Sequence, residues 1–219
     1  MKKNLIFLAL YLVIFSNANA QTRFGIRAGL NLADINGKTN GVSYNSDTEI
    51  RIGFHLGGII DIALAEKSYF QPGLLFSSKG SRAENSSPGV TTTSNTNLGY
   101  LEIPLNIGYR VNAGSNKLLL TAGPYLGLGI TGTVTTKVTT GNVSVKETRD
   151  VEWGNSANST LKPLDFGVNL GIGTEFSNFQ VNLQYGLGLS NNRPKGNSDN
   201  TSRNSVISIS LGYFFGSRK

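Results

Sequence analysis

Apolar and polar residues alternate with a period of two along most of the chain. In the segment 165–189, for example, apolar side chains occupy every second position from Phe166 to Ile172 and again from Phe179 to Leu189. Successive side chains of a β-strand point to opposite faces, so this segment predicts a hairpin with one apolar face. The same alternation predicts eight strands in all, within residues 24–32, 51–64, 69–77, 100–110, 118–130, 165–176, 179–189 and 206–215.

The connections between these segments are alternately long and short. The long ones, rich in Asn, Ser, Thr and Gly, are residues 33–50, 80–97, 132–163 and 191–204, and the short ones are 65–68, 112–116 and 177–178. This rhythm is typical of an up-and-down barrel with tight turns at one end and long loops at the other. In the longest connection we predict a hairpin that projects beyond the membrane, turns near Gly141 and Asn142, and brings Val134 and Val138 opposite Val143 and Val145.

Glycine is frequent on the polar side of the strands, which indicates the side that faces inward. On the water-exposed face of a soluble sheet, glycine weakens the strand without an evident use. Inside a closed barrel of eight strands, glycine leaves room for large side chains such as Tyr100 and Tyr125 to cross the lumen. The apolar side then faces lipid, where only a closed sheet pairs every backbone group and strands of about 9–11 residues span the bilayer.

The predicted fold is therefore all-β: an eight-stranded, antiparallel, up-and-down transmembrane β-barrel with long extracellular loops and short periplasmic turns. The alternative at the level of the fold is a soluble ligand-binding barrel, which would point large apolar residues inward. Here the positions predicted to face inward are glycine and polar. Outward aromatic residues collect near the short turns and form a predicted periplasmic girdle of Phe24, Phe70, Tyr109, Phe176, Phe179, Tyr213 and Phe215.

Charged side chains on the inward face predict a polar network across the lumen. Buried charges persist when they are paired, so we expect arginines and carboxylates to meet in layers and plug the barrel. The alternative interpretation is a narrow channel lined with charges of both signs. The predicted network has Arg51, Glu102 and Asp165 toward the loops, Arg27 and His55 in the middle, and Asp61, Arg110 and Glu175 toward the turns.

The first 20 residues have the features of a cleavable secretory signal. Two lysines precede an apolar stretch at residues 5–15, and Ala18-Asn19-Ala20 is a small-x-small cleavage site. The apolar stretch is shorter than the roughly 20 residues of a membrane-spanning helix, which argues against an anchor. We therefore predict a signal peptide at residues 1–20, Sec-type export to the outer membrane, and a barrel domain at residues 21–219.

Composition narrows the expected partners. The chain carries a formal charge of +7, yet export and the lack of a basic cluster interleaved with aromatic residues argue against nucleic acid. Membrane lipid is the expected partner. Basic residues at the loop end are candidates to bind phosphates of surface lipopolysaccharide, with an ordinary solvated rim as the competing explanation; they are Lys79, Arg82, Lys162, Arg193, Lys195 and Arg203.

We predict no catalytic, cofactor-binding or metal-binding residues and expect that the protein is not an enzyme. The chain has no cysteine and one histidine, His55, which excludes a histidine metal cluster and favours a hydrogen-bonding role in the lumen. Residues 127–132 match the dinucleotide pattern GxGxxG, but that pattern binds a cofactor only between a strand and a helix. A membrane-embedded hydrolase or acyltransferase would need acids, serine or histidine clustered at the loop rim, where the sequence has only scattered ones.

Four segments resemble the PorT-type outer-membrane β-barrel proteins of Gram-negative bacteria. They are FQPGLLFSSKG at residues 70–80, YLEIPLNIGYRV at 100–111, LDFGVNLGIGTEF at 164–176 and ISLGYFF at 209–215, and YLEIPL is the most specific part. The resemblance implies a signal peptide, an eight-stranded barrel and residence in the outer membrane, and it carries no catalytic residues. The named member is tied to protein secretion, a role that a shared barrel does not transfer.

These features together predict an outer-membrane barrel with a structural or interaction role, whose loops present a surface to an envelope protein partner. A small-solute porin or channel is the first alternative. An accessory component of a protein secretion system is the second.

Overall fold

The computed structural model describes residues 22–43, 48–114 and 116–216, and the predicted signal peptide at residues 1–20 lies outside this part of the chain. Eleven strands make up the described secondary structure, and every ladder between them is antiparallel. No helix among the described residues is long and apolar enough to cross a bilayer. The strands are β1 (Thr22–Thr39), β2 (Val42–Ser43), β3 (Thr48–Glu49), β4 (Arg51–Ala63), β5 (Ser68–Ser87), β6 (Val90–Ala113), β7 (Asn116–Thr140), β8 (Val143–Asp150), β9 (Leu164–Phe176), β10 (Phe179–Gly188) and β11 (Thr201–Phe215).

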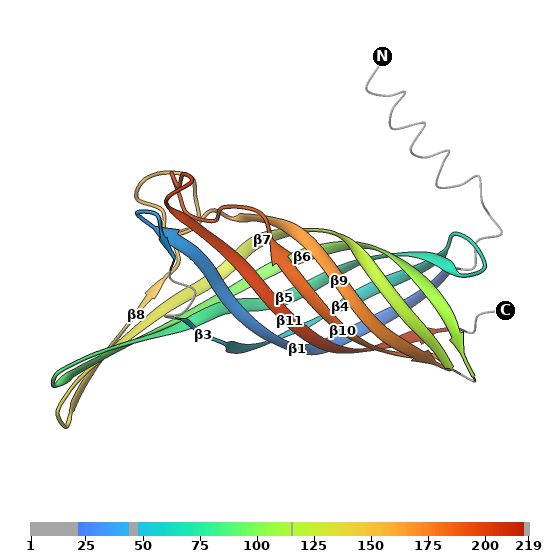
Figure 1. Ribbon diagram of the computed structural model, residues 1–219, viewed down its shortest axis with the longest axis horizontal. Helices are drawn as coiled ribbons and strands as arrows, with labels where there is room; N and C mark the ends of the chain where they lie inside the picture. Colours follow the sequence, from blue (N-terminus) through green and yellow to red (C-terminus); the bar gives the residue numbers. More distant parts are fainter. Residues whose placement is uncertain (1–21, 44–47, 115, 217–219) are drawn as a thin grey trace, which may run out of the picture.

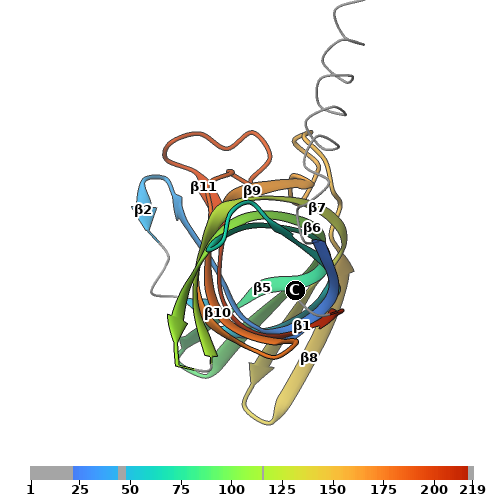
Figure 2. The same cartoon turned by 90° about the vertical axis from the view of Figure 1, so that its right-hand side faces the viewer.

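Eight of these strands close into a ring, which confirms the predicted fold class. The order is β11-β10-β9-β7-β6-β5-β4-β1, and β11 pairs back onto β1 from Phe24↔Phe215 to Lys38↔Thr201 (Figure 2). The described part of the chain ends beside the short turns, while the long connections gather at the opposite end (Figure 1). The strands β2, β3 and β8 pair outside this ring, each with one neighbour among the described strands.

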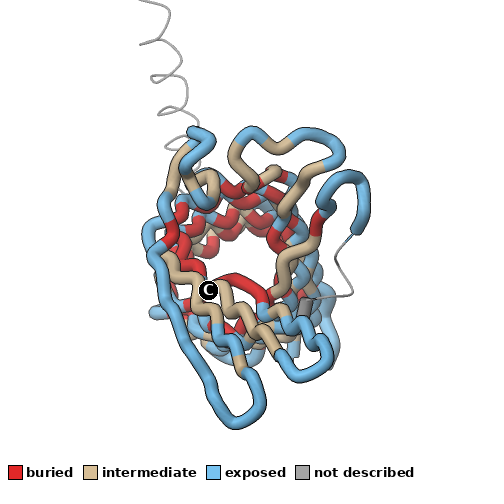
Figure 3. The backbone as a smooth tube through the Cα atoms, turned by 90° about the vertical axis from the view of Figure 1, so that its left-hand side faces the viewer, coloured by how far each residue is buried: buried red, intermediate tan, exposed pale blue. Residues whose placement is uncertain are grey.

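The faces of the barrel are inverted relative to a soluble protein, as predicted. On β9 and β10, Leu170 and Leu183 expose 58% and 51% of their surface, whereas Asn169 exposes 3%. Buried positions recur around the wall of the ring, and the projecting loops are exposed (Figure 3). Apolar side chains thus cover the outside of the barrel, and polar side chains fill its lumen.

The strands continue further beyond the ring than the alternation predicts. Residues 80–97, expected to be a loop, belong to a β5/β6 hairpin whose ladder runs to Ser87↔Val90. Together β5, β6, β7 and β8 form a four-stranded sheet that tapers away from the barrel, here called the extension (Figure 1). Its threonines and valines favour strands, but because both of its faces lie in water the sequence shows no apolar alternation there.

The hairpin predicted in the longest connection is confirmed. Strands β7 and β8 pair from Thr133↔Asp150 to Thr140↔Val143 around a turn at residues 141–142. Val138 faces Val145, as predicted, whereas Val134 faces Arg149 rather than a valine.

Glycines on the inner face leave room for aromatic rings, which accounts for their number. A Cβ atom at Gly108 would collide with the ring of Tyr69, and one at Gly129 would collide with the ring of Trp153. A Cβ at Gly167 would lie 2.7 Å from Cε1 of Tyr125. The lumen is therefore packed by large side chains that lie against bare backbone.

Candidate functional site

Four buried charges form a layer across the lumen near the short turns, here called the turn-end layer. Arg23 donates hydrogen bonds from Nη2 to Asp61 Oδ2 (2.9 Å) and to Glu175 Oε2 (3.0 Å). Arg110 contacts the same two carboxylates, and its Nη2 lies 3.4 Å from Glu175 Oε2. None of the four residues exposes more than 4% of its surface. Two cations and two carboxylates thus neutralise each other inside the barrel.

Aromatic rings cover this layer on both sides. The guanidinium carbon of Arg110 lies 3.6 Å from the ring centroid of Tyr69, and that of Arg23 lies 4.4 Å from the centroid of Phe214. Phe214 breaks the polar alternation of β11, and the structure places it fully inside the lumen. The predicted network does not include Arg23. This residue lies directly before the predicted start of its strand, and alternation places it on the same inward face as Arg27.

A second layer crosses the lumen nearer the loops, here called the loop-end layer. Lys79 Nζ lies 2.7 Å from Glu102 Oε2 and 3.2 Å from Asp165 Oδ2. Asp165 also accepts hydrogen bonds from Asn204 Nδ2 (2.8 Å) and Ser190 Oγ (2.7 Å). The expectation that Lys79 belongs to the exposed loop rim is therefore wrong. It is 3% exposed, because β5 continues past residue 78 and turns this side chain inward.

An apolar cap closes the lumen above the loop-end layer. Its core consists of Leu98, Tyr100 and Val151, with Trp153 packed against them. The rings of Tyr100 and Trp153 meet edge to face, with centroids 5.6 Å apart. Trp153 and Val151 belong to the irregular segment between β8 and β9. Because this segment has no hydrophobic periodicity, the sequence does not predict that these two residues are buried.

Arg27 lies between the two layers and is held by amides rather than carboxylates. Its Nη2 donates to Gln180 Oε1 (3.0 Å) and to Gln71 Oε1, and Gln71 Nε2 also reaches Gln180 Oε1 (3.3 Å). Arg27 takes part in no ion pair among the described residues. The prediction placed it in the middle of the lumen, and the structure finds it there, 5% exposed.

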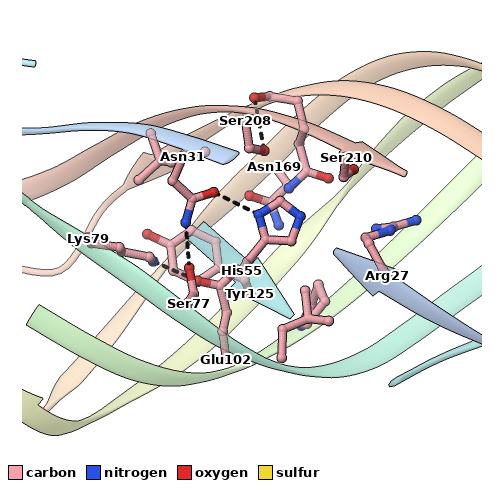
Figure 4. A pocket seen from close by; sticks show the side chains of 15 residues that line it. Arg27, Asn31, His55, Ser77, Lys79, Glu102, Tyr125, Asn169, Ser208 and Ser210 are labelled. Atoms are coloured by element: carbon pink, nitrogen blue, oxygen red, sulfur yellow. Dashed lines mark hydrogen bonds and ion pairs between the residues drawn. The ribbon is translucent and has the colours of Figure 1, made fainter. Parts of the chain in front are cut away.

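His55 also lies in the middle of the lumen, beside a small cavity (Figure 4). Its Nδ1 lies 2.8 Å from Asn31 Oδ1, and Asn31 Nδ2 lies 3.2 Å from Ser77 Oγ. The cavity has a volume of about 30 Å³, counted as the space open to centres of water molecules. That is room for about two waters, since one needs roughly 10–15 Å³ by this measure. The polar lining is that of a hydrated pocket between two charged layers.

Arg51 does not join the loop-end layer, contrary to the prediction. It is half-buried, and its Nη1 lies 3.2 Å from Ser78 Oγ and 3.3 Å from the carbonyl oxygen of Lys79. The β4/β5 ladder ends at His55↔Ser77, so the side chain turns toward the backbone of β5 instead of crossing the lumen. Lys79 takes the place that Arg51 was expected to fill between Glu102 and Asp165.

The seven residues of the predicted aromatic girdle lie at the strand ends nearest the short turns. Five of them are exposed, and Phe70 and Tyr213 are half-buried among their neighbours. Phe179 contacts rings on both neighbouring strands, at 5.7 Å to Phe176 and 5.1 Å to Tyr213. Tyr213 continues this row to Phe215 at 5.4 Å. Aromatic residues at this level suit a bilayer interface.

The other cations predicted at the loop end differ in their exposure and in their partners. Arg82 is already paired, with Glu49 at 3.3 Å and Glu84 at 3.2 Å. Arg193 donates to Thr39 Oγ1 at 3.1 Å. Lys195 and Arg203 are exposed, and Lys162 is half-buried. Backbone hydrogen bonds join Lys162 N to Asn192 O and Asn192 N to Ser202 O, so Lys162, Arg193 and Arg203 lie on adjoining segments.

The chemistry of the lumen is that of a closed structure. Among the described residues, the buried charges comprise four cations and four carboxylates and sum to zero; they are Arg23, Arg27, Lys79, Arg110, Asp61, Glu102, Asp165 and Glu175. Two ion-paired layers and the cap lie one above another along the barrel axis. The arrangement is able to bind water and to resist passage of solutes.

Comparison with known proteins agrees with this architecture. The chain matches the family described as outer membrane protein beta-barrel domain over residues 16–193. Among solved structures it is similar to Neisserial surface protein A, with 12% identity over 88% of this chain and 97% of that chain and a TM-score of 0.42.

Two further structures have similar coverage. A major outer membrane protein from Thermus thermophilus shows 11% identity over 89% of this chain and 100% of that chain, with a TM-score of 0.45. Ail, the attachment invasion locus protein of Yersinia pestis, shows 14% identity over 89% of this chain and 99% of that chain, with a TM-score of 0.38. Likenesses this distant say nothing about ligands or activity. No curated protein matches the chain.

Proposed function

The chain belongs to the outer membrane protein β-barrel domain family, and from that premise we propose that it is a plugged barrel which anchors an interaction surface outside the cell. The outer membrane holds the barrel through its apolar belt. The extension carries the surface that meets a partner. The role is one of binding and structure rather than catalysis.

The observation that carries this proposal is the double closure of the lumen. Arg23 and Arg110 bridge two carboxylates at one level, and Lys79 bridges two others at a second level. A solute would have to break both layers and displace the cap. Breaking a buried ion pair costs about 3–5 kcal/mol, which favours a permanent plug over a resting channel.

The extension supports an interaction role because it exposes apolar side chains beyond the barrel. Val143 and Val145 expose 67% and 66% of their surface. The pairs Val138↔Val145 and Thr140↔Val143 put these valines on one face of the sheet. In addition, β8 pairs only with β7 among the described strands, so its other edge is available to a partner strand.

Planar-bilayer recordings on the purified full chain test the plug. We expect no stable channel steps from the wild type, while an open porin recorded in the same membranes serves as the positive control. Stable steps of uniform size would contradict the plug and support the small-solute channel instead.

Photo-crosslinking in intact cells tests the interaction surface. A photoreactive residue at position 145, at the tip of the extension, should give a discrete protein adduct, and one at position 170, on the lipid-facing side, should not. Replacing residues 84–93 and 136–147 by Asn-Gly turns joins the cross-strand partners Ala83 with Ser94 and Thr135 with Thr148. This shortened variant should insert into the membrane normally. Photoreactive residues placed near the rim of the barrel should then no longer capture a partner that binds the extension. Equal adducts at positions 145 and 170 would contradict the proposal.

Finer predictions rest on the sequence alone. An accessory component of a protein secretion system is a further alternative, which a deletion strain tests by the loss of secreted proteins from the medium. Lipopolysaccharide is the candidate ligand of the remaining loop-end cations, and charge-removing substitutions at Arg193, Lys195 and Arg203 should then reduce its co-purification.

A further inference from the structure

A groove lies on the outer wall of the barrel where the extension diverges from the ring, here called the seam groove. Its volume is about 430 Å³. It extends over β1, β4, β5, β6 and β7, and its lining includes Leu30, Arg51, Phe54, Phe76, Ser78 and Asn97. The groove opens on the lipid side of the wall, since Leu30 and Phe54 expose 56% and 51% of their surface.

The floor of the groove is a seam in the sheet. The β4/β5 ladder stops at His55↔Ser77, and pairing with β5 resumes only where β3 places Glu49 opposite Arg82. Between these points side chains replace backbone pairing. Asn31 Nδ2 donates from the lumen side to the carbonyl oxygens of Phe54 (3.2 Å) and Ser78 (3.0 Å). Asn31 thereby supplies a donor to two carbonyl oxygens of the seam, and an unpaired backbone group is costly inside a membrane.

The seam groove is amphipathic along the barrel axis. Toward the turns its wall is apolar, where the rings of Phe54 and Phe76 lie 5.6 Å apart beside Leu30. Toward the loops most of its lining side chains are polar, with Ile52 among them; the polar ones are Arg51, Ser78, Asn97, Thr131 and Thr133. A membrane lipid has the same polarity in the leaflet nearest the loops, with its acyl chains toward the bilayer centre and its headgroup toward the loops.

Arg51 gives the polar end a charge of fixed sign. It takes part in no ion pair among the described residues, and its hydrogen bonds to β5 use Nη1 alone. The remaining guanidinium donors, on Nη2 and Nε, suit the fork geometry with which arginine binds phosphate oxygens. Ser78 Oγ and the side-chain amide of Asn97 lie within 3.5 Å of each other at the same end and add neutral hydrogen-bonding groups.

We propose that the seam groove binds one phosphate-bearing lipid of the outer leaflet. The phosphate group contacts Arg51, and an acyl chain lies along Phe54, Phe76 and Leu30. The lipid covers the seam on its membrane side, while Asn31 closes it on the lumen side. This inference goes beyond the proposed function, because it concerns the barrel wall and not the extension.

Native mass spectrometry of the full chain in a neutral detergent tests the site. The probe is dioleoyl phosphatidic acid, compared with dioleoylglycerol, which has the same chains and no phosphate, and with inorganic phosphate. We expect one phosphatidic acid per barrel and no retained dioleoylglycerol, and inorganic phosphate should not displace the lipid. R51Q should weaken retention at least about tenfold, the effect of losing a charge-assisted hydrogen bond.

Matched variants keep the test decisive. R149Q removes an exposed cation of β8 outside the groove and should leave retention unchanged. R51K keeps the charge but not the guanidinium fork, so its retention should lie between those of the wild type and R51Q. F76A should weaken retention, and F166A, on the lipid-facing side of β9, should not. Unchanged retention in R51Q, equal losses in R51Q and R149Q, or displacement by inorganic phosphate would overturn the proposal.

Discussion

The two ion-paired layers of the lumen differ in how their buried carboxylates are neutralised. In the turn-end layer, two arginines share two carboxylates, and each arginine reaches both. In the loop-end layer, a single lysine serves two carboxylates, so one negative charge is left over. Neutral donors from Asn204 and Ser190 hold the second carboxylate in place. The first layer is redundant, and the second depends on one side chain.

One more buried cation, Arg27, offsets the excess negative charge of the loop-end layer in the total for the lumen. Arg27 lies between the layers, surrounded by glutamine amides, and has no ion pair among the described residues. Its positive charge brings the buried total to zero. The lumen as a whole is therefore neutral, but only in the turn-end layer does each carboxylate contact two cations. The difference between the layers predicts which substitutions the barrel tolerates.

The largest effect is expected from K79M. It leaves Glu102 and Asp165 buried without a cation, and breaking a buried pair in this way costs about 3–5 kcal/mol of unfolding free energy. Urea titration of the protein in phospholipid vesicles, followed by far-UV circular dichroism, measures the change. The fluorescence of Trp153 should change first, because the cap lies directly above this layer. A loss below about 1 kcal/mol would contradict the dependence on a single lysine.

The double variant K79M/E102Q sharpens this result. Removing one of the two uncompensated carboxylates should restore part of the stability that K79M loses, and residues in one ion-pair network couple by about 0.5–3 kcal/mol. E102Q alone should cost less than K79M, since Lys79 keeps its contact with Asp165 at 3.2 Å. If the double variant is as unstable as the sum of the single variants, electrostatic coupling within the layer is absent.

A smaller effect is expected from R110M in the turn-end layer. Arg23 continues to donate to both Asp61 and Glu175, so neither carboxylate is left without a partner. We expect a loss of about 1.5–3 kcal/mol, the range for hydrogen bonds to charged groups, in the same urea titration. R23M serves as the matched variant. R110M losses that equal those of K79M would remove the distinction between a redundant layer and a dependent one.

A still smaller effect is expected from R27M. The substitution breaks no ion pair. Gln180 Oε1 keeps its hydrogen bonds from Gln71 Nε2 and Asn182 Nδ2, so Gln71 Oε1 is the acceptor that loses its donor. Leaving one buried acceptor without its donor costs about 1–2 kcal/mol. R27K should behave like the wild type, because it preserves the charge. Greater stability in R27M would show that the lumen does not need to be neutral overall.

Much of the ring was predictable from the sequence, and the reason is the membrane. Lipid outside and water-poor packing inside force a strict alternation, so the inward parity of Asp61, Arg110 and Glu175 follows from counting along each strand. The fourth member, Arg23, has the same parity but lies one residue before the predicted start of its strand at residue 24. The turn-end layer is therefore predictable from the alternation along the strands.

The loop-end half was less predictable because its constraints are tertiary. Where both faces of a strand meet water, alternation stops, so the extension leaves no periodic signal. Lys79 has the inward parity of Ser77 and lies two residues beyond the predicted end of its strand. The position of Arg51 depends on where the β4/β5 ladder ends, which is a matter of register between strands and not of either strand alone. Trp153 reaches the cap from an irregular segment, for which the pattern of residues carries no information.

The smallest effect is expected from an ion pair that resembles the lumen pairs in distance and differs only in its surroundings. Arg149 Nη2 lies 2.8 Å from Glu147 Oε1 on β8, with side-chain exposures of 76% and 61%. Water screens both charges before and after the substitution, so R149Q should change the unfolding free energy by less than about 0.5 kcal/mol in the same vesicle titration. Short distance alone does not make an ion pair important, and the contrast with Lys79 isolates burial as the cause. A loss comparable to that of R110M would instead mean that the extension unfolds together with the barrel.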